Sequence, residues 1–87
     1  MLGANPEELR ALAQEMLLRA ELLKDARATL SGKINGSLQW HGRDAFFFKH
    51  AWNSSHAPTL LKTAELLREA SRKLQQQAQQ QEDTSSG

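Results

Sequence analysis

The chain has 87 residues, of which 39% are hydrophobic, a formal net charge of +1 and no cysteine. A chain of this length forms one domain with limited buried surface, and the lack of cysteine excludes disulfides and thiolate metal sites. The balanced charge gives no indication of binding to nucleic acid or to an anionic membrane surface. We therefore expect association with another chain to supply additional stability.

The N-terminal residues predict neither a Sec-type signal peptide nor a membrane anchor. They lack a basic segment followed by an apolar one, and no apolar run approaches the roughly 20 residues needed to cross a bilayer. The expected starting location is the cytoplasm.

The first predicted helix covers residues 6–38. Asn5 is a favourable N-cap and Pro6 fits the first helical position. Apolar residues that recur every seven positions predict a packing seam at Leu9, Met16, Leu23 and Leu30. Two adjacent pairs widen this stripe beyond what one partner helix covers: Leu17 with Leu18, and Leu22 with Leu23.

A turn is expected at about residues 39–43. Gly42 can adopt a positive φ or permit a close approach, and Trp40 can fold back over the corner. Asp44 can then open the second helix, where its carboxylate faces unpaired backbone N–H groups. The central region therefore predicts a helical hairpin.

The second predicted helix covers residues 44–81, with a kink or break just before Pro58, which has no backbone N–H to donate. Phe46, Phe47 and Phe48 are consecutive and span about 200° of the helix surface, too much for one antiparallel neighbour to cover. Residues 82–87 are expected to form a flexible tail. Residues 1–81 thus form the predicted hairpin domain.

Trp40, His41 and Gly42 stand at the turn between the two helices, and Ala45, Phe48 and Trp52 follow. With the late spacing of Leu60, Leu67 and Leu74, this arrangement resembles the WXG family of small type VII (ESX) secretion proteins, the relatives of the early secreted antigenic target. The resemblance covers nearly the whole chain. It implies an all-α antiparallel hairpin with a Trp-x-Gly turn, which dimerises into a four-helix bundle and leaves the cell folded by a non-Sec route.

The apolar stripes predict which residues form the dimer interface. The partner is either a second copy of the chain or a paralogous subunit of the same family. The expected interface residues are Leu17, Leu18, Leu22, Leu23, Phe46, Phe47, Phe48 and Trp52.

Members of the family often carry a Tyr-x-x-x-Asp/Glu export signal near the C-terminus, beside the Trp-x-Gly turn of the partner. This chain contains no tyrosine, and the corresponding positions hold Gln79 and Asp83, which keep the spacing without the aromatic ring. The resemblance therefore implies that the secretion ATPase recognises a signal supplied by the partner subunit.

The sequence predicts no enzyme, no metal site and no bound cofactor. His50 and His56 would lie about 240° apart on a straight helix, and Ser54, Ser55 and His56 have no acidic neighbour to orient a catalytic histidine. Two alternatives to a secreted substrate remain: a cytosolic adaptor or chaperone that covers a helical domain of a larger effector, and a role at a membrane after export.

Overall fold

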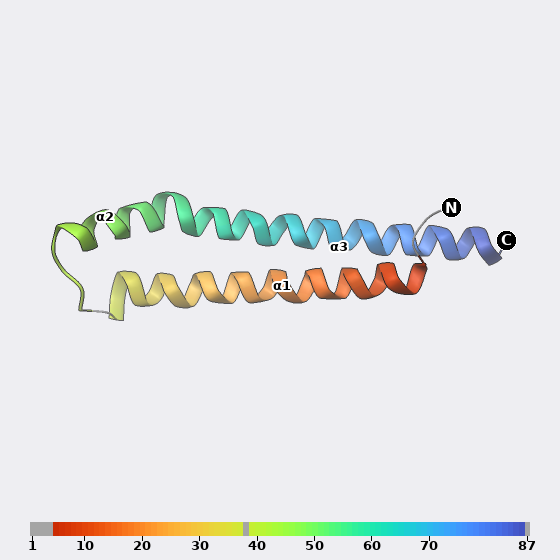
Figure 1. Ribbon diagram of the computed structural model, residues 1–87, viewed down its shortest axis with the longest axis horizontal. Coiled ribbons are helices and arrows are strands. Elements are labelled where there is room, and N and C mark those ends of the chain that lie inside the picture. Colours follow the sequence, from red (N-terminus) through yellow and green to blue (C-terminus); the bar gives the residue numbers. More distant parts are fainter. Residues whose placement is uncertain (1–4, 38, 87) are drawn as a thin grey trace.

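The computed structural model describes residues 5–37 and 39–86, and the regular secondary structure within these ranges is helical. Helix α1 (Pro6–Gly32) continues into a π-helical segment, η1 (Lys33–Ser37). After the loop, helix α2 (Arg43–Ala51) passes through a second π-helical segment, η2 (Trp52–His56), into helix α3 (Ala57–Ser86). Helices α1 and α3 lie side by side, with the loop at one end of the molecule (Figure 1). The predicted all-α helical hairpin is confirmed.

The hairpin is long and thin. Its principal extents are 65 × 18 × 14 Å, and its radius of gyration is 19.0 Å, whereas a compact chain of this length has roughly 12 Å. Each helix therefore has only one neighbour, and most of its circumference faces outward.

Helix α1 begins as the sequence predicts. The Asn5 side-chain oxygen accepts a hydrogen bond from the backbone N–H of Glu7 at 2.7 Å, and Pro6 occupies the first turn. The cap satisfies one of the backbone donors that a helix N-terminus leaves unpaired.

Small residues line the seam between α1 and α3. The small buried positions on α3 are spaced by seven, and so are those on α1: Ala57, Ala64, Ser71 and Ala78 on α3, and Ala13 and Ala20 on α1. The larger Ile34, in η1, is buried fourteen residues after Ala20. Because alanine allows the helix backbones to approach closely, the larger residues beside the seam are pushed to its edges. Met16 and Leu23 are only half-buried and Leu30 is exposed, so the predicted seam through them is wrong, except at Leu9, which is buried.

The predicted break before Pro58 takes the form of the π-helical segment η2. The backbone N–H of Ala57 donates to the carbonyl of Trp52, five residues earlier. This wider turn places Trp52 and Ala57 on the same side of the helix. The chain therefore stays helical past Pro58, and the interruption absorbs one residue without turning the seam away from α1.

Two predicted boundaries differ from the structure. Helix α3 extends to Ser86, so residues 82–86 are helical and the prediction of a tail from residue 82 is wrong for them. The second helix starts at Arg43, and Asp44 lies within its first turn rather than capping it. Leu38, at the predicted end of the first helix, lies outside the described residues, as do residues 1–4 and 87.

The chain leaves the loop through Gly42, which has φ = 107°. A side chain at this position would be strained whatever the space around it. The glycine thus provides the positive φ that the sequence predicts before the second helix.

Candidate interaction surface

One side of the hairpin is polar and carries ion pairs between α1 and α3. The Arg68 guanidinium donates to the Glu21 carboxylate at 2.5 Å, and Arg10 is paired with Glu82. An open groove on this side, between the ion pairs, is lined by Leu17, Arg68, Ser71, Arg72 and Gln75. Beneath it, the buried Ser71 hydroxyl donates to the Ala13 carbonyl at 2.8 Å, so this side also contributes polar contacts within the seam.

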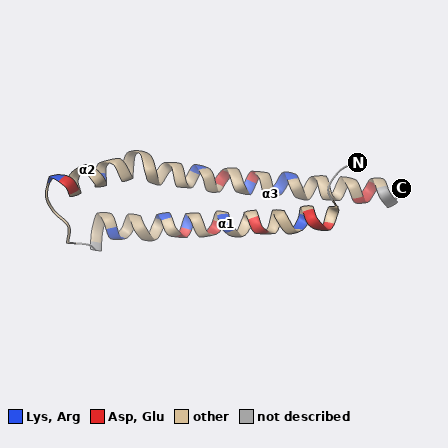
Figure 2. Cartoon of the chain, viewed as in Figure 1, with Lys and Arg blue, Asp and Glu red and all other residues tan. Residues whose placement is uncertain are grey.

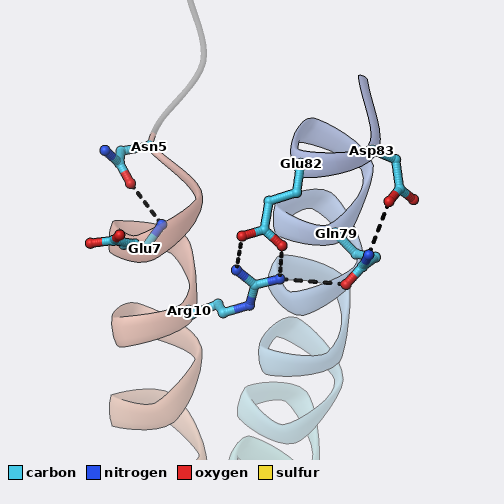
Figure 3. A network of polar contacts seen from close by, with 6 residues as sticks. All are labelled: Asn5, Glu7, Arg10, Gln79, Glu82 and Asp83. Atoms are coloured by element: carbon cyan, nitrogen blue, oxygen red, sulfur yellow. Dashed lines mark hydrogen bonds and ion pairs between the residues drawn. The ribbon is translucent and has the colours of Figure 1, made fainter. Parts of the chain in front are cut away.

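A polar network holds the end of the hairpin opposite the loop (Figure 3). The two terminal nitrogens of Arg10 donate to the two carboxylate oxygens of Glu82, at 2.7 and 2.5 Å. The Gln79 side chain accepts from Arg10 at 3.5 Å and donates to Asp83 at 3.1 Å. The hydrogen bond from Arg10 lowers the pKa of the Glu82 carboxyl, reinforced by the charge of Arg10 and opposed by desolvation.

The opposite side of the hairpin is apolar. Each residue of a helix is rotated by about 100° around the helix axis from the one before it. Four large side chains of α1 therefore point in one direction to within about 40°: Leu12, Met16, Leu23 and Leu30. Measured from Leu12, the seam residues Ala13 and Ala20 lie about 90° round the helix, and the ion-pairing residues Arg10 and Glu21 about 170°. The row therefore lies on the flank of the seam away from the ion pairs.

The same arithmetic places an apolar row on α3. It occupies the flank of the seam opposite Arg68 and Arg72 and consists of Leu67, Ala70 and Leu74, whereas Leu66 points about 150° from the seam, away from α1. We call the two rows together the apolar side. Leu12 and Leu30 are exposed within it, and its other members are half-buried.

The structure divides the predicted interface residues between several directions. Leu23 lies on the apolar side, Leu17 lines the polar groove, and Leu18 and Leu22 face outward, away from α3. These leucines cannot meet one flat partner together. Leu12 was not predicted as an interface residue, although the 18-residue interval from Leu12 to Leu30, five full turns, was available as a signal.

Trp52 is not an exposed interface residue, and that prediction is corrected. It is buried within the hairpin in a cluster with Ile34 and Ala57, against which Leu60 packs. Its indole N–H donates to the Ser31 hydroxyl at 2.9 Å. An amphipathic ring with a satisfied N–H is suited to such a position, and Trp52 therefore joins η2 to α1.

Aromatic rings gather at the loop end. Trp40 and Phe48 have ring centroids 5.3 Å apart, and Phe46 and Phe47 form an edge-to-face pair at 5.5 Å. The Lys49 ammonium donates to the Trp40 carbonyl at 3.0 Å, which ties the loop to α2. Phe46, Phe47 and Phe48 are all exposed, as their consecutive positions predict.

Charge is distributed unevenly along the hairpin. Residues 26–64, which form the loop half, contain five Lys or Arg and only one acidic residue, Asp44, whereas the rest of the chain contains six Lys or Arg and nine Asp or Glu. All three histidines also lie in the loop half, at positions 41, 50 and 56. Figure 2 shows the acidic residues from the middle of the hairpin to the end away from the loop, and also at the start of α2. The molecule is therefore positive at its loop half and negative at the other.

The described residues contain no group of histidine and acidic side chains arranged to hold a metal ion. None of the helices described is long and apolar enough to cross a membrane. No protein-family model, curated protein or solved structure matches this chain.

Proposed function

We propose that this chain is a non-enzymatic interaction protein that pairs with a second helical hairpin through its apolar side. The resulting four-helix bundle is exported folded, as the resemblance to WXG-type type VII secretion substrates implies. The observation that carries the proposal is the continuous apolar side, with Leu12 and Leu30 exposed on it. Full burial of a leucine contributes about 1.5–3 kcal/mol, so a second hairpin on this side adds stability that the thin monomer lacks.

The distribution of charge supports an antiparallel pair of identical hairpins. In that orientation the positive loop half of one chain lies beside the negative half of the other, whereas a parallel pair places like charges together. A paralogous hairpin that is also positive at its loop half and negative at its other half pairs in the same antiparallel orientation. The ion pairs of the polar side, such as Glu21 with Arg68, then remain at the outer surface of the bundle.

The export step of the proposal rests on Trp40 and Gly42. Glu82 and Gln79 are already held by Arg10, and the chain has no tyrosine to complete a Tyr-x-x-x-Asp/Glu signal with Asp83. The secretion ATPase therefore recognises a composite surface, to which this chain contributes Trp40. A paralogous hairpin that takes the place of the second copy contributes the aromatic and acidic residues, because a second copy also lacks tyrosine.

Secretion from a host with a type VII system tests this step. Trp40→Ala should reduce the amount of protein in the culture medium while the bundle still assembles, and Phe46→Ala, an exposed aromatic nearby, serves as the matched control. Coexpression of a signal-bearing partner should raise secretion of the wild-type chain. Efficient secretion of the chain alone, or equal secretion of Trp40→Ala and wild type, would contradict the composite signal.

The absence of tyrosine from the whole chain also favours a second candidate, a cytosolic adaptor. In that role the apolar side covers a helical domain of a larger effector. Obligate copurification with one larger protein at equal stoichiometry, and absence of the chain from the culture medium, would distinguish the adaptor from the secreted substrate.

A further inference from the structure

The loop end presents aromatic side chains in several directions. Phe46 is 66% exposed and Phe47 is 59% exposed, and these consecutive positions on α2 point about 100° apart. Ala45 is buried, so it marks the side of α2 that faces the hairpin. We call Trp40 together with Phe46, Phe47 and Phe48 the aromatic tip.

A second hairpin on the apolar side covers at most part of the aromatic tip. Measured from the inward-facing Ala45, Phe48 and Phe46 point to opposite flanks of α2, and Phe47 points outward. A flat or rigid helical partner meets one of these directions at a time. A flexible segment that becomes ordered on binding can wrap around a convex surface and reach all of them.

The charges around the aromatic tip select an acidic segment. Lys33, Arg43 and Lys49 lie within residues 33–56, with Asp44 as the single acidic residue of that stretch. This excess is smaller than the clusters of roughly four to eight basic residues that hold proteins on anionic lipid. The local charge therefore fits a carboxylate-bearing polypeptide better than a lipid surface.

The aromatic tip is also preformed. The Trp40 ring packs on Phe48, and Lys49 fixes the Trp40 carbonyl, so the loop and α2 form one unit. Preformed rings lose little additional freedom on binding, which leaves the ordering cost mainly with the partner segment.

We propose that the aromatic tip is a second interaction surface, separate from the apolar side, which binds a flexible acidic segment of another protein that carries apolar side chains. The rings contact the apolar side chains of the segment, and Arg43 and Lys49 face its carboxylates. This surface does not require the hairpin to dimerise or to be exported.

A titration with synthetic peptides tests the proposal. The probe alternates glutamate with leucine and phenylalanine, and the control peptide has lysine at each glutamate position. We expect the full chain to bind the acidic peptide at least ~10-fold more tightly than the lysine peptide, a difference of about 1.4 kcal/mol, and to lose affinity as salt is raised. In NMR spectra of the wild-type chain, the peptide should shift the amide signals of residues 40–49 and not those near Arg10.

Paired surface variants provide the control. The double variant Phe46→Ser/Phe47→Ser should lose at least ~10-fold in affinity for the acidic peptide. Leu66→Ser should bind as the wild type does. Leu66 is 65% exposed, about as much as Phe46, but it lies on α3 and outside the aromatic tip. Circular dichroism of both variants should match the wild type, and the NMR shifts locate the site even if one variant is less helical.

Three results would overturn the proposal. The first is equal affinity for the acidic and lysine peptides, and the second is an equal loss of affinity in the Leu66→Ser variant. The third is binding to phosphatidylglycerol-containing vesicles, with shifts at residues 40–49, in the absence of peptide binding. That last result would assign the aromatic tip to a lipid surface instead.

Discussion

Asn35 and Asn53 exchange a reciprocal pair of hydrogen bonds across the hairpin. Each side-chain amide donates to the oxygen of the other, at 3.0 and 2.9 Å, and Asn35 also donates to the Ser31 carbonyl at 2.9 Å. The two residues belong to η1 and η2, so the two π-helical segments face and hold each other. Because asparagine has both a donor and an acceptor, only a matched amide pair completes this contact.

Replacing Asn53 with Asp should therefore loosen the loop half. The carboxylate accepts from the Asn35 amide but cannot donate in return, and its second oxygen faces the Asn35 oxygen. We expect a loss of about 0.5–1.5 kcal/mol in the free energy of unfolding, since the contact is exposed. Denaturant unfolding of Asn53→Asp, and of Asn35→Asp/Asn53→Asp as the doubly charged case, checks this. Equal stability of all three proteins would show that the amide pair contributes nothing.

Deleting Ser55 should convert η2 into an ordinary α-helical turn without moving the seam. Trp52 and Ala57 would then be four positions apart, which also places them on one side of a helix. We expect helicity and melting temperature close to the wild type. Deleting the exposed Gln76 is the control, because it rotates Ala78 about 100° away from α1 and should be clearly destabilising. If the two deletions destabilise equally, η2 does not act as a register adjustment.

Enlarging a seam alanine should destabilise the hairpin far more than enlarging a nearby surface alanine. Ala13 is fully buried, and Ala11, in the same helix, is exposed. Ala13→Leu forces the helices apart and breaks the Ser71 contact, at an expected cost of about 1–3 kcal/mol, whereas Ala11→Leu should change stability by less than about 0.5 kcal/mol. Thermal unfolding of the two variants measures the difference. A similar melting temperature for both would mean that the helices are not closely packed at Ala13.

The hairpin, the cap at Asn5 and the interruption before Pro58 could be predicted because each depends on local chemistry: an acceptor at a helix start, a missing N–H, a glycine in a turn. The position of the seam could not be predicted from the leucines, since Ala13, Ala20 and Ala64 contribute little hydrophobicity yet permit the closest approach. Their seven-residue spacing was the available signal.

The extent of α3 was missed for a different reason. Its end is stabilised by a long-range contact between Glu82 and Arg10, which the composition of the C-terminal residues does not indicate. Burial of Trp52 was missed in the same way, because it depends on Ile34 in η1 and on the hydrogen bond to Ser31 across the hairpin. Exposure of Phe46 and Phe47 was predictable, because consecutive helical positions cannot all face one neighbour.

The ion pair between Arg10 and Glu82 makes the stability of the hairpin depend on pH. The hydrogen bond from Arg10 lowers the pKa of the Glu82 carboxyl below its ordinary value of 4.5. A group with a lowered pKa in the folded state adds stability that is fully present above its unfolded pKa and is lost as pH falls through the folded pKa. The contribution of Glu82 should therefore be intact at pH 7 and should disappear progressively below about pH 4.5.

Comparison of Glu82→Gln with the wild type isolates this contribution. The difference in melting temperature between the two proteins should be largest near pH 7 and shrink in acid, and it should also shrink at high salt because both side chains are largely exposed. Glu69→Gln, whose carboxylate pairs with Arg72 within the same helix, is the matched control. A difference that stays constant from pH 7 to acid would show that Glu82 acts through packing rather than charge.

We expect the apolar side to be covered by a second copy of the hairpin when the chain is alone in solution. Sedimentation equilibrium of the purified chain at micromolar concentration tests it most directly, together with Leu12→Glu/Leu30→Glu, which places carboxylates on the apolar side, and Leu18→Glu, an exposed leucine that faces outward. Wild type and Leu18→Glu should sediment at twice the 9.7 kDa mass of one chain, with a melting temperature that rises with concentration, and Leu12→Glu/Leu30→Glu should shift toward the single-chain mass. A folded wild-type chain that sediments at 9.7 kDa, with a melting temperature independent of concentration, would contradict the claim.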